Sequence, residues 1–239
     1  MPIFLIIMWY DTLYCIEIGV KMEMKEKIKS ILRSDRFVII LGLVIVPLFS
    51  FILITISEES PLYTSISRIA WVHDKWFATF VWALILMCAV LLITYRMVEA
   101  GPLNKRAKQT FLICQSVNIV LVFAGCILFP AKNGTEIISF ANYLHDYLTM
   151  AAWAMYGIGL LVYSFMLKRH DRYLGFLGLG LMSFIIFSSA FFISRVVDPA
   201  SYVGASAVSE VYIINSLFIY LVVMYVTERL KLGITEKVE

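Results

Sequence analysis

Charged residues are scarce in this sequence. Only 15% of its 239 residues are Asp, Glu, Lys or Arg, whereas 61% are hydrophobic, and the mean hydropathy is +0.86. A typical soluble domain is about 25% charged and about 45–50% apolar, so this composition excludes a soluble globular chain. The stretches between the apolar runs are short and leave no room for a soluble domain between them.

Cysteine patterns and catalytic motifs are also missing. The four cysteines (Cys15, Cys88, Cys114 and Cys126) lack the spacing of metal ligands, and three of them fall inside apolar runs. They are interpreted as small buried apolar side chains, and a disulfide framework is not expected. Neither HExxH nor GxSxG supports a metal or serine site. No basic patch is interleaved with aromatics outside the apolar runs, so nothing supports nucleic-acid binding.

What the sequence does have is apolar runs of bilayer length. A spanning helix needs about 20 apolar residues. Six segments qualify, at about 37–56, 77–97, 109–129, 146–167, 173–194 and 208–227. We therefore predict an all-α fold, a polytopic membrane bundle of six transmembrane helices.

Two features of these runs predict local geometry. Pro47 lies in the middle of the first run and should kink that helix or open its hydrogen bonding. Glycines in the fourth and fifth runs should let those two helices approach closely, as a tight hairpin. These glycines are Gly157, Gly159, Gly175, Gly178 and Gly180.

Lys and Arg are distributed unevenly between the two expected membrane faces. One face has 16 of the 20 basic residues, and the other has only Arg68, Lys75, Lys132 and Arg195. The positive-inside rule therefore predicts that both termini are cytoplasmic. Residues 1–36 form an N-terminal cytoplasmic segment, 37–230 the transmembrane domain and 231–239 a cytoplasmic tail. We expect an integral membrane location, which is the plasma (cell) membrane if the source is bacterial.

The first 20 residues do not fit a leader sequence. They are apolar but are interrupted by Asp11 and Glu17, and no basic segment precedes them. We predict that translation starts at Met22 or Met24 and that residues 1–20 are a mis-annotated start. The alternative is an amphipathic segment on the inner leaflet.

Three polar pairs lie where the second, fourth and sixth spans begin. They are His73-Asp74, His145-Asp146 and Ser209-Glu210. The three spans run in the same direction, so the pairs should lie at one extracytoplasmic face. Ionisable groups at the edge of the hydrocarbon are unfavourable without a partner or a task, so we expect the functional site there.

Two interpretations of these pairs remain open. In one, Asp74, Asp146 and Glu210 are helix N-terminal caps, which the helix dipole favours. In the other, the pairs share a pocket. The candidate catalytic residues are then His73, Asp74, His145, Asp146 and Glu210, because a histidine beside a carboxylate is a general acid–base unit.

Metal and headgroup binding are further hypotheses at the same face. His73, His145, Asp146 and Glu210 are ligand types for zinc or another divalent metal, although the sequence requires no cofactor. Arg68 and Arg195 are headgroup-binding candidates, because a guanidinium holds phosphate or carboxylate with two hydrogen bonds. Ser209 is the third headgroup-binding candidate.

Short motifs at these positions resemble the Frag/DRAM/Sfk six-span membrane proteins and a related bacterial six-span family of unknown function. They are Tyr63-Thr-Ser-Ile-Ser67, Phe129-Pro130, Leu144-His145-Asp146 and Val208-Ser209-Glu210. The resemblance covers about residues 37–230 and departs at Ile69-Ala70, where the family pattern favours Leu or Thr followed by Gly. It implies lipid association, since members are linked to remodelling of GPI-anchor lipids, plasma-membrane lipid organisation and autophagy at lysosomes. The shared positions it implies are His145, Asp146 and Glu210.

The predicted function is therefore an integral membrane protein that binds, organises or regulates lipids through an extracytoplasmic polar pocket. The alternative is an intramembrane enzyme, dependent on a metal or on a His–carboxylate pair, that acts on a lipid headgroup or acyl bond. Whether the chain is an enzyme stays open. A small transporter is least favoured, since it would need unwound helices or charges at mid-membrane. The expected partners are membrane lipids, and a protein partner or a homo-oligomer is compatible with the sequence.

Overall fold

The computed structural model describes residues 31, 34–57, 64–71, 74–129, 140–196 and 206–235. The regular secondary structure of these residues is helical, and no strand occurs among them. The chain divides into two units, residues 1–39 and residues 40–239. The described part of the first unit includes most of helix α2 (Asp35–Ile40). The predicted translation start at Met22 or Met24 lies outside the described residues.

Helices account for most of the second unit. They are η1 (Leu41–Ile45), α3 (Val46–Thr55), α4 (Ile66–Trp71), α5 (Trp76–Ala100), α6 (Lys105–Leu128), α7 (Phe140–His170), α8 (Arg172–Val196) and α9 (Ala207–Thr235). Six helical segments are long and apolar enough to cross a membrane, namely Asp35–Thr55, Trp76–Ala100, Lys105–Leu128, Tyr143–His170, Arg172–Ala190 and Ala207–Lys231. The predicted six-helix membrane bundle is confirmed, and the chain is an integral membrane protein.

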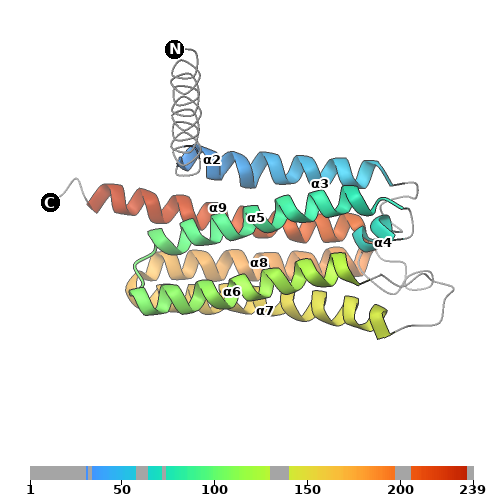
Figure 1. Cartoon of the computed structure of the whole chain (residues 1–239). Coiled ribbons are helices and arrows are strands. Elements are labelled where there is room, and N and C mark those ends of the chain that lie inside the picture. The colour runs from blue at the N-terminus through green and yellow to red at the C-terminus, as the bar shows by residue number, and fades with distance from the viewer. Residues whose placement is uncertain are drawn as a thin grey trace, which may run out of the picture. The chain divides into compact units, whose positions relative to one another are not determined.

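Five long helices of the second unit form a closed ring (Figure 1). Helix α5 packs against α6, α6 against α7, α7 against α8, α8 against α9, and α9 against α5. Helix α3 and the η1 turn pack against α5 and α9. We call one end of the ring the α4 end, because α4 lies there with the starts of α5, α7 and α9. At the other end, the hairpin end, α5 connects to α6 and α7 connects to α8.

The proline of the first span has the predicted effect on hydrogen bonding. Pro47 has no N–H to donate, and the η1 segment directly before it is a π-helical turn in which the Val46 N–H bonds to the Leu41 carbonyl. A wider turn of this kind accommodates a missing donor. Gly42 lies in this turn, and a Cβ added to it would be only 2.6 Å from Cγ2 of Val222 on α9. The glycine therefore allows the turn to pack closely on the ring.

Helices α7 and α8 pack as tightly as predicted near the hairpin end. A Cβ added to Gly175 would collide with the backbone of Lys168, and one added to Gly178 would collide with the Ser164 hydroxyl. The predicted close approach is confirmed at these two positions.

Further from the hairpin end the same prediction is wrong. A Cβ added to Gly157 on α7 or Gly180 on α8 would meet no atom within 4 Å. Gly159 does make a close approach, but its neighbour is the Gln115 side chain on α6 rather than α8. The sequence shows which helices contain glycine, but not which face each glycine is on. Gly180, for example, is exposed.

Candidate functional site, a cavity inside the helix ring

The half of the ring nearer the α4 end encloses a cavity of about 450 Å³. All five ring helices and Ile66 of α4 line this cavity. The lining residues extend from Thr79 to Val90 on α5 and from His145 to Gly157 on α7. At 1.5 Å per residue, these stretches are about 17 and 18 Å long.

The cavity opens sideways between α7 and α8. Among its lining residues, those exposed at the protein surface are Met150 and Ala154 on α7 and Ile186 on α8. Met150 is 72% exposed and Ile186 is 50% exposed. Gly157 follows Met150 and Ala154 on the same face of α7, since residues at i, i+4 and i+7 lie one above another. Open space beside Gly157 thus coincides with an opening toward the lipid-facing surface.

Two of the predicted site residues, His145 and Glu210, both line this cavity near the α4 end. Oε2 of Glu210 accepts a hydrogen bond of 2.8 Å from the Ile66 N–H, which ties α9 to α4. The Ala207 N–H donates to the Thr64 carbonyl over 2.6 Å and strengthens the same connection. The Oε1 atom of Glu210 has no hydrogen-bond partner among the described residues and is left to accept from the cavity.

The hydrogen bond of His145 fixes which ring nitrogen holds the proton. Nδ1 lies 2.9 Å from the Phe129 carbonyl oxygen. A carbonyl can only accept, so Nδ1 must be the donor. Nε2 of a neutral His145 is therefore left with a free lone pair, and no partner for it occurs in the described part of the chain. His145 and Glu210 thus both offer acceptor atoms at the cavity.

Further polar side chains lie near the same end of the cavity. Ser189 on α8 is buried, and its hydroxyl has no hydrogen-bond partner within the described residues. Cys126 Sγ and Thr149 Oγ1 lie 3.8 Å apart and satisfy each other weakly. No Lys or Arg side chain is among the described residues that line the cavity. The polar groups are therefore neutral or acidic, with acceptors in excess.

The remaining residues of the three pairs are not brought to this cavity by the described structure. Asp74 is exposed and has a left-handed backbone with φ 54°, a conformation that Asp tolerates better than most residues. His73 lies outside the described residues. Asp146 follows His145 on α7, and its side chain is also outside the described part. The catalytic roles of these three residues stay predictions.

The capping interpretation is wrong for two of the pairs. Helix α7 begins at Phe140, so His145 and Asp146 lie in its second turn, beyond the four amides that a cap would serve. Ser206 caps α9, because its hydroxyl accepts the Ser209 N–H over 3.2 Å. Glu210 instead accepts the amide of Ile66 at the start of α4. Its carboxylate therefore joins two helices rather than ending its own.

Two of the headgroup-binding candidates, Arg68 and Ser209, lie at the α4 end but are not among the residues that line the cavity. Arg68 on α4 is half-buried. Ser209 is fully buried, and its hydroxyl donates to the Ser206 carbonyl over 2.8 Å. The side chain of Arg195 lies outside the described part of α8. A role in headgroup binding stays a prediction for all three.

A metal centre is not assembled from the described residues. No group of three His, Cys, Asp or Glu side chains among them is close enough to hold an ion. Because His73 and the Asp146 side chain are outside this set, the four-residue metal hypothesis stays a prediction.

The sequence analysis missed a second polar cluster, which fills the ring toward the hairpin end. Tyr156, Tyr163 and Tyr220 are fully buried. Tyr156 OH lies 2.8 Å from Thr94 Oγ1, and Tyr163 OH donates to Glu228 Oε1 over 2.9 Å. The signal that could have revealed this cluster is the spacing of Tyr156 and Tyr163, which are two helical turns apart on one face.

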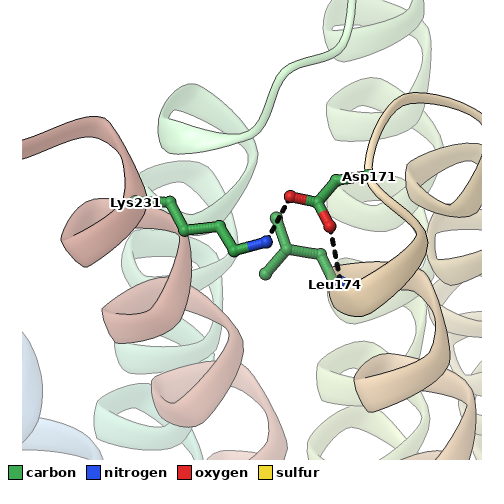
Figure 2. A network of polar contacts seen from close by, with 3 residues as sticks. All are labelled: Asp171, Leu174 and Lys231. Carbon is green, nitrogen blue, oxygen red and sulfur yellow. Dashed lines mark hydrogen bonds and ion pairs between the residues drawn. The ribbon is translucent and has the colours of Figure 1, made fainter. Parts of the chain in front are cut away.

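At the hairpin end a polar contact joins Asp171, the residue directly before α8, to Lys231 on α9 (Figure 2). The Asp171 carboxylate accepts from the Leu174 N–H over 3.0 Å and also from the Lys231 ammonium group. Partial burial of Asp171 opposes ionisation, but these hydrogen bonds and the charge of Lys231 outweigh it. The pKa of Asp171 is therefore lowered below its ordinary value of 3.8.

Comparison with family models, curated proteins and solved structures finds no match to this chain. The resemblance to six-span lipid-associated proteins therefore stays a prediction.

Proposed function

We propose that this integral membrane protein binds a membrane lipid, with an acyl chain inside the ring cavity. The observation that supports the proposal is the sideways opening at Met150, Ala154 and Ile186 into a largely apolar space of about 450 Å³. Ligand pockets typically occupy about 300–1,000 Å³ and combine apolar walls with a few polar groups. An unfilled space would forfeit the dispersion contacts that a chain makes with the walls.

We further propose that the α4 end faces away from the cytoplasm. The support is the clustering of 16 of 20 basic residues in the segments that belong to the opposite face. The polar end of the cavity would then lie in the outer leaflet, of the cell membrane if the protein is bacterial. The protein would hold, organise or sense a lipid of that leaflet.

Photolabelling in liposomes tests whether a chain enters the cavity. The protein is reconstituted with a single-chain lipid that has a diazirine in its chain, irradiated, and analysed by mass spectrometry. We expect labels on Trp82 and Leu217, which line the cavity but are only 5% and 7% exposed. Lipid that merely surrounds the protein cannot reach these two side chains.

A matched pair of glycine variants is the control. Gly157→Leu should fill the cavity beside the opening and remove the labels on Trp82 and Leu217. Gly180→Leu adds the same side chain at a position that also has open space but does not line the cavity. It should leave the labels in place. Unlabelled Trp82 and Leu217 in the unmodified protein, or equal loss in both variants, would refute the proposal.

A lipid-acting enzyme is the second candidate, favoured by the free Nε2 of His145 at the polar end of the cavity. A histidine so placed can act as a general base. His145→Asn keeps an N–H donor for the Phe129 carbonyl and removes the base. The enzyme hypothesis predicts a lipid product that the purified protein forms and His145→Asn does not. If the unmodified protein forms no product from the lipid it binds, the enzyme hypothesis is wrong and only the lipid-binding proposal stands.

A further inference from the structure

The size of the cavity limits how many chains it can hold. A water molecule occupies about 30 Å³, and a methylene group is of closely similar size. The volume of about 450 Å³ therefore has room for roughly 15 methylene groups. That corresponds to one acyl chain of ordinary length rather than two.

The depth of the cavity agrees with this estimate. Its lining extends over about 17 Å of α5 and about 18 Å of α7 at 1.5 Å per residue. Half of a hydrocarbon core that is about 30 Å thick is about 15 Å. A chain that enters between α7 and α8 could therefore lie alongside the chains of one leaflet, with its head at the α4 end.

The polar atoms at the α4 end of the cavity determine which lipid head groups can bind there. The described residues provide no hydrogen-bond partner for Glu210 Oε1, His145 Nε2 or the Ser189 hydroxyl, so the first two can accept and the hydroxyl can donate or accept. A group with hydrogen-bond donors, and with or without a positive charge, satisfies these atoms. A phosphate, sulfonate or carboxylate would meet the Glu210 carboxyl, and no Lys or Arg among the described lining residues would balance its charge.

We infer that the ligand of this cavity is a single-chain lipid whose head is a hydrogen-bond donor, namely a hydroxyl or a primary amine. The inference rests on the proposed function and narrows it to a ligand class. It predicts discrimination by head charge and by chain number at one and the same site.

Competition against the photolabel on unmodified protein tests both parts of the inference. The probe is a long-chain alcohol with a diazirine in its chain, and labelling of Trp82 is measured in liposomes. The competitors share chain length and are compared at equal mole fraction in the bilayer. They are a monoacylglycerol, a long-chain amine, a long-chain sulfonate and a diacylglycerol.

The monoacylglycerol and the amine should displace the probe at about tenfold lower mole fraction than the sulfonate, as expected when a hydrogen bond to a charged group is gained or lost. The diacylglycerol has a hydroxyl head but two chains, and it should not displace the probe. If sulfonate or diacylglycerol competes as well as the monoacylglycerol, the inference is wrong while the proposed function stands. If Trp82 is never labelled, the proposed function itself fails.

The variant Glu210→Gln tests whether Glu210 is the residue that contacts the lipid head. The glutamine carbonyl can still accept the Ile66 N–H, so the connection between α9 and α4 is retained. We expect the amine to lose about tenfold in potency and the monoacylglycerol to change little. An unchanged amine potency would overturn the role of Glu210. Should this variant not fold, Ser189→Ala is the substitute, with weaker binding of both heads expected and unchanged binding overturning the head site.

Discussion

The space inside the helix ring, between α5, α7 and α9, is packed differently toward its two ends. Toward the hairpin end the space is occupied by buried Tyr156, Tyr163 and Tyr220, whose hydroxyls find partners on neighbouring helices. Toward the α4 end the space is the cavity, which opens between α7 and α8. We call these regions the tyrosine half and the hollow half.

The difference shows how one set of helices can combine a tightly packed region with an open cavity. Inside a bilayer, packing contacts and interhelical hydrogen bonds hold helices together, because lipid supplies no hydrophobic driving force between them. The tyrosine half supplies both kinds of contact. The hollow half has fewer such contacts, and the described residues supply no partner for one acceptor atom each of Glu210 and His145. One oxygen of Glu228 in the tyrosine half also has no described partner.

The largest effect on this comparison should come from emptying the tyrosine half. Tyr220→Ala removes a fully buried ring and should destabilise the fold by about 3–5 kcal/mol, as large-to-small aromatic substitutions do. Tyr220→Phe removes only the hydroxyl, which contacts the Ser164 hydroxyl and the Leu160 carbonyl, and should lose about 0.6 kcal/mol per hydrogen bond. Thermal unfolding in detergent, followed by size-exclusion chromatography, measures both. Equal losses would mean that the hydrogen bonds of Tyr220, and not the packing of its aromatic ring, stabilise the tyrosine half.

A smaller difference in stability should distinguish substitutions at the packed glycine and at the open glycine of α8. Gly175→Ala places a methyl group against the backbone of Lys168, which cannot move aside, and should lose about 1–3 kcal/mol of stability. Gly180→Ala meets open space and should gain up to about 1 kcal/mol from helix propensity. The same unfolding measurement applies. If the two variants behave alike, Gly175 does not pack more closely against its neighbours than Gly180 does.

The smallest effect should come from the Asp171 contact at the hairpin end. Asp171→Ala loses both the cap on α8 and the interaction with Lys231, and should destabilise by about 1 kcal/mol. Asp171→Asn keeps a good N-cap side chain and loses only the ion pair, which is partly exposed and is expected to contribute less than about 1 kcal/mol.

The pH dependence of this contact has a definite sign. Because the pKa of Asp171 is lowered in the folded state, the ion pair adds stability above pH 3.8, and this addition is lost as the pH falls below that value. The gap in unfolding temperature between the unmodified protein and Asp171→Asn should therefore close on acidification. A gap that persists at acidic pH would show that it does not arise from the carboxylate charge.

Much of the fold could be predicted because bilayer thickness sets the length of an apolar run. The six runs and the effect of Pro47 were confirmed for this reason. Helix ends were harder to predict from the sequence. Helix α7 begins at Phe140, before the apolar run, and His145 therefore lies in its second turn. The residue pairs drew attention to His145 and Glu210, which do share the cavity. Ser189 had no such signal, because a serine in a span is usually a packing residue.

The sequence by itself determined that the chain spans a membrane with six helices, and it placed polar residues near three helix starts. The hydropathy and length of a segment depend only on its own residues, so a span can be predicted without knowing which helices pack against it. Only the tertiary structure decided that the ring is filled at one end and hollow at the other. That outcome depends on which helix faces meet: a Cβ added to Gly175 would collide with Lys168, whereas one added to Gly157 would meet no atom within 4 Å. Packing of this kind is a relation between helices, and it cannot be obtained from one helix at a time.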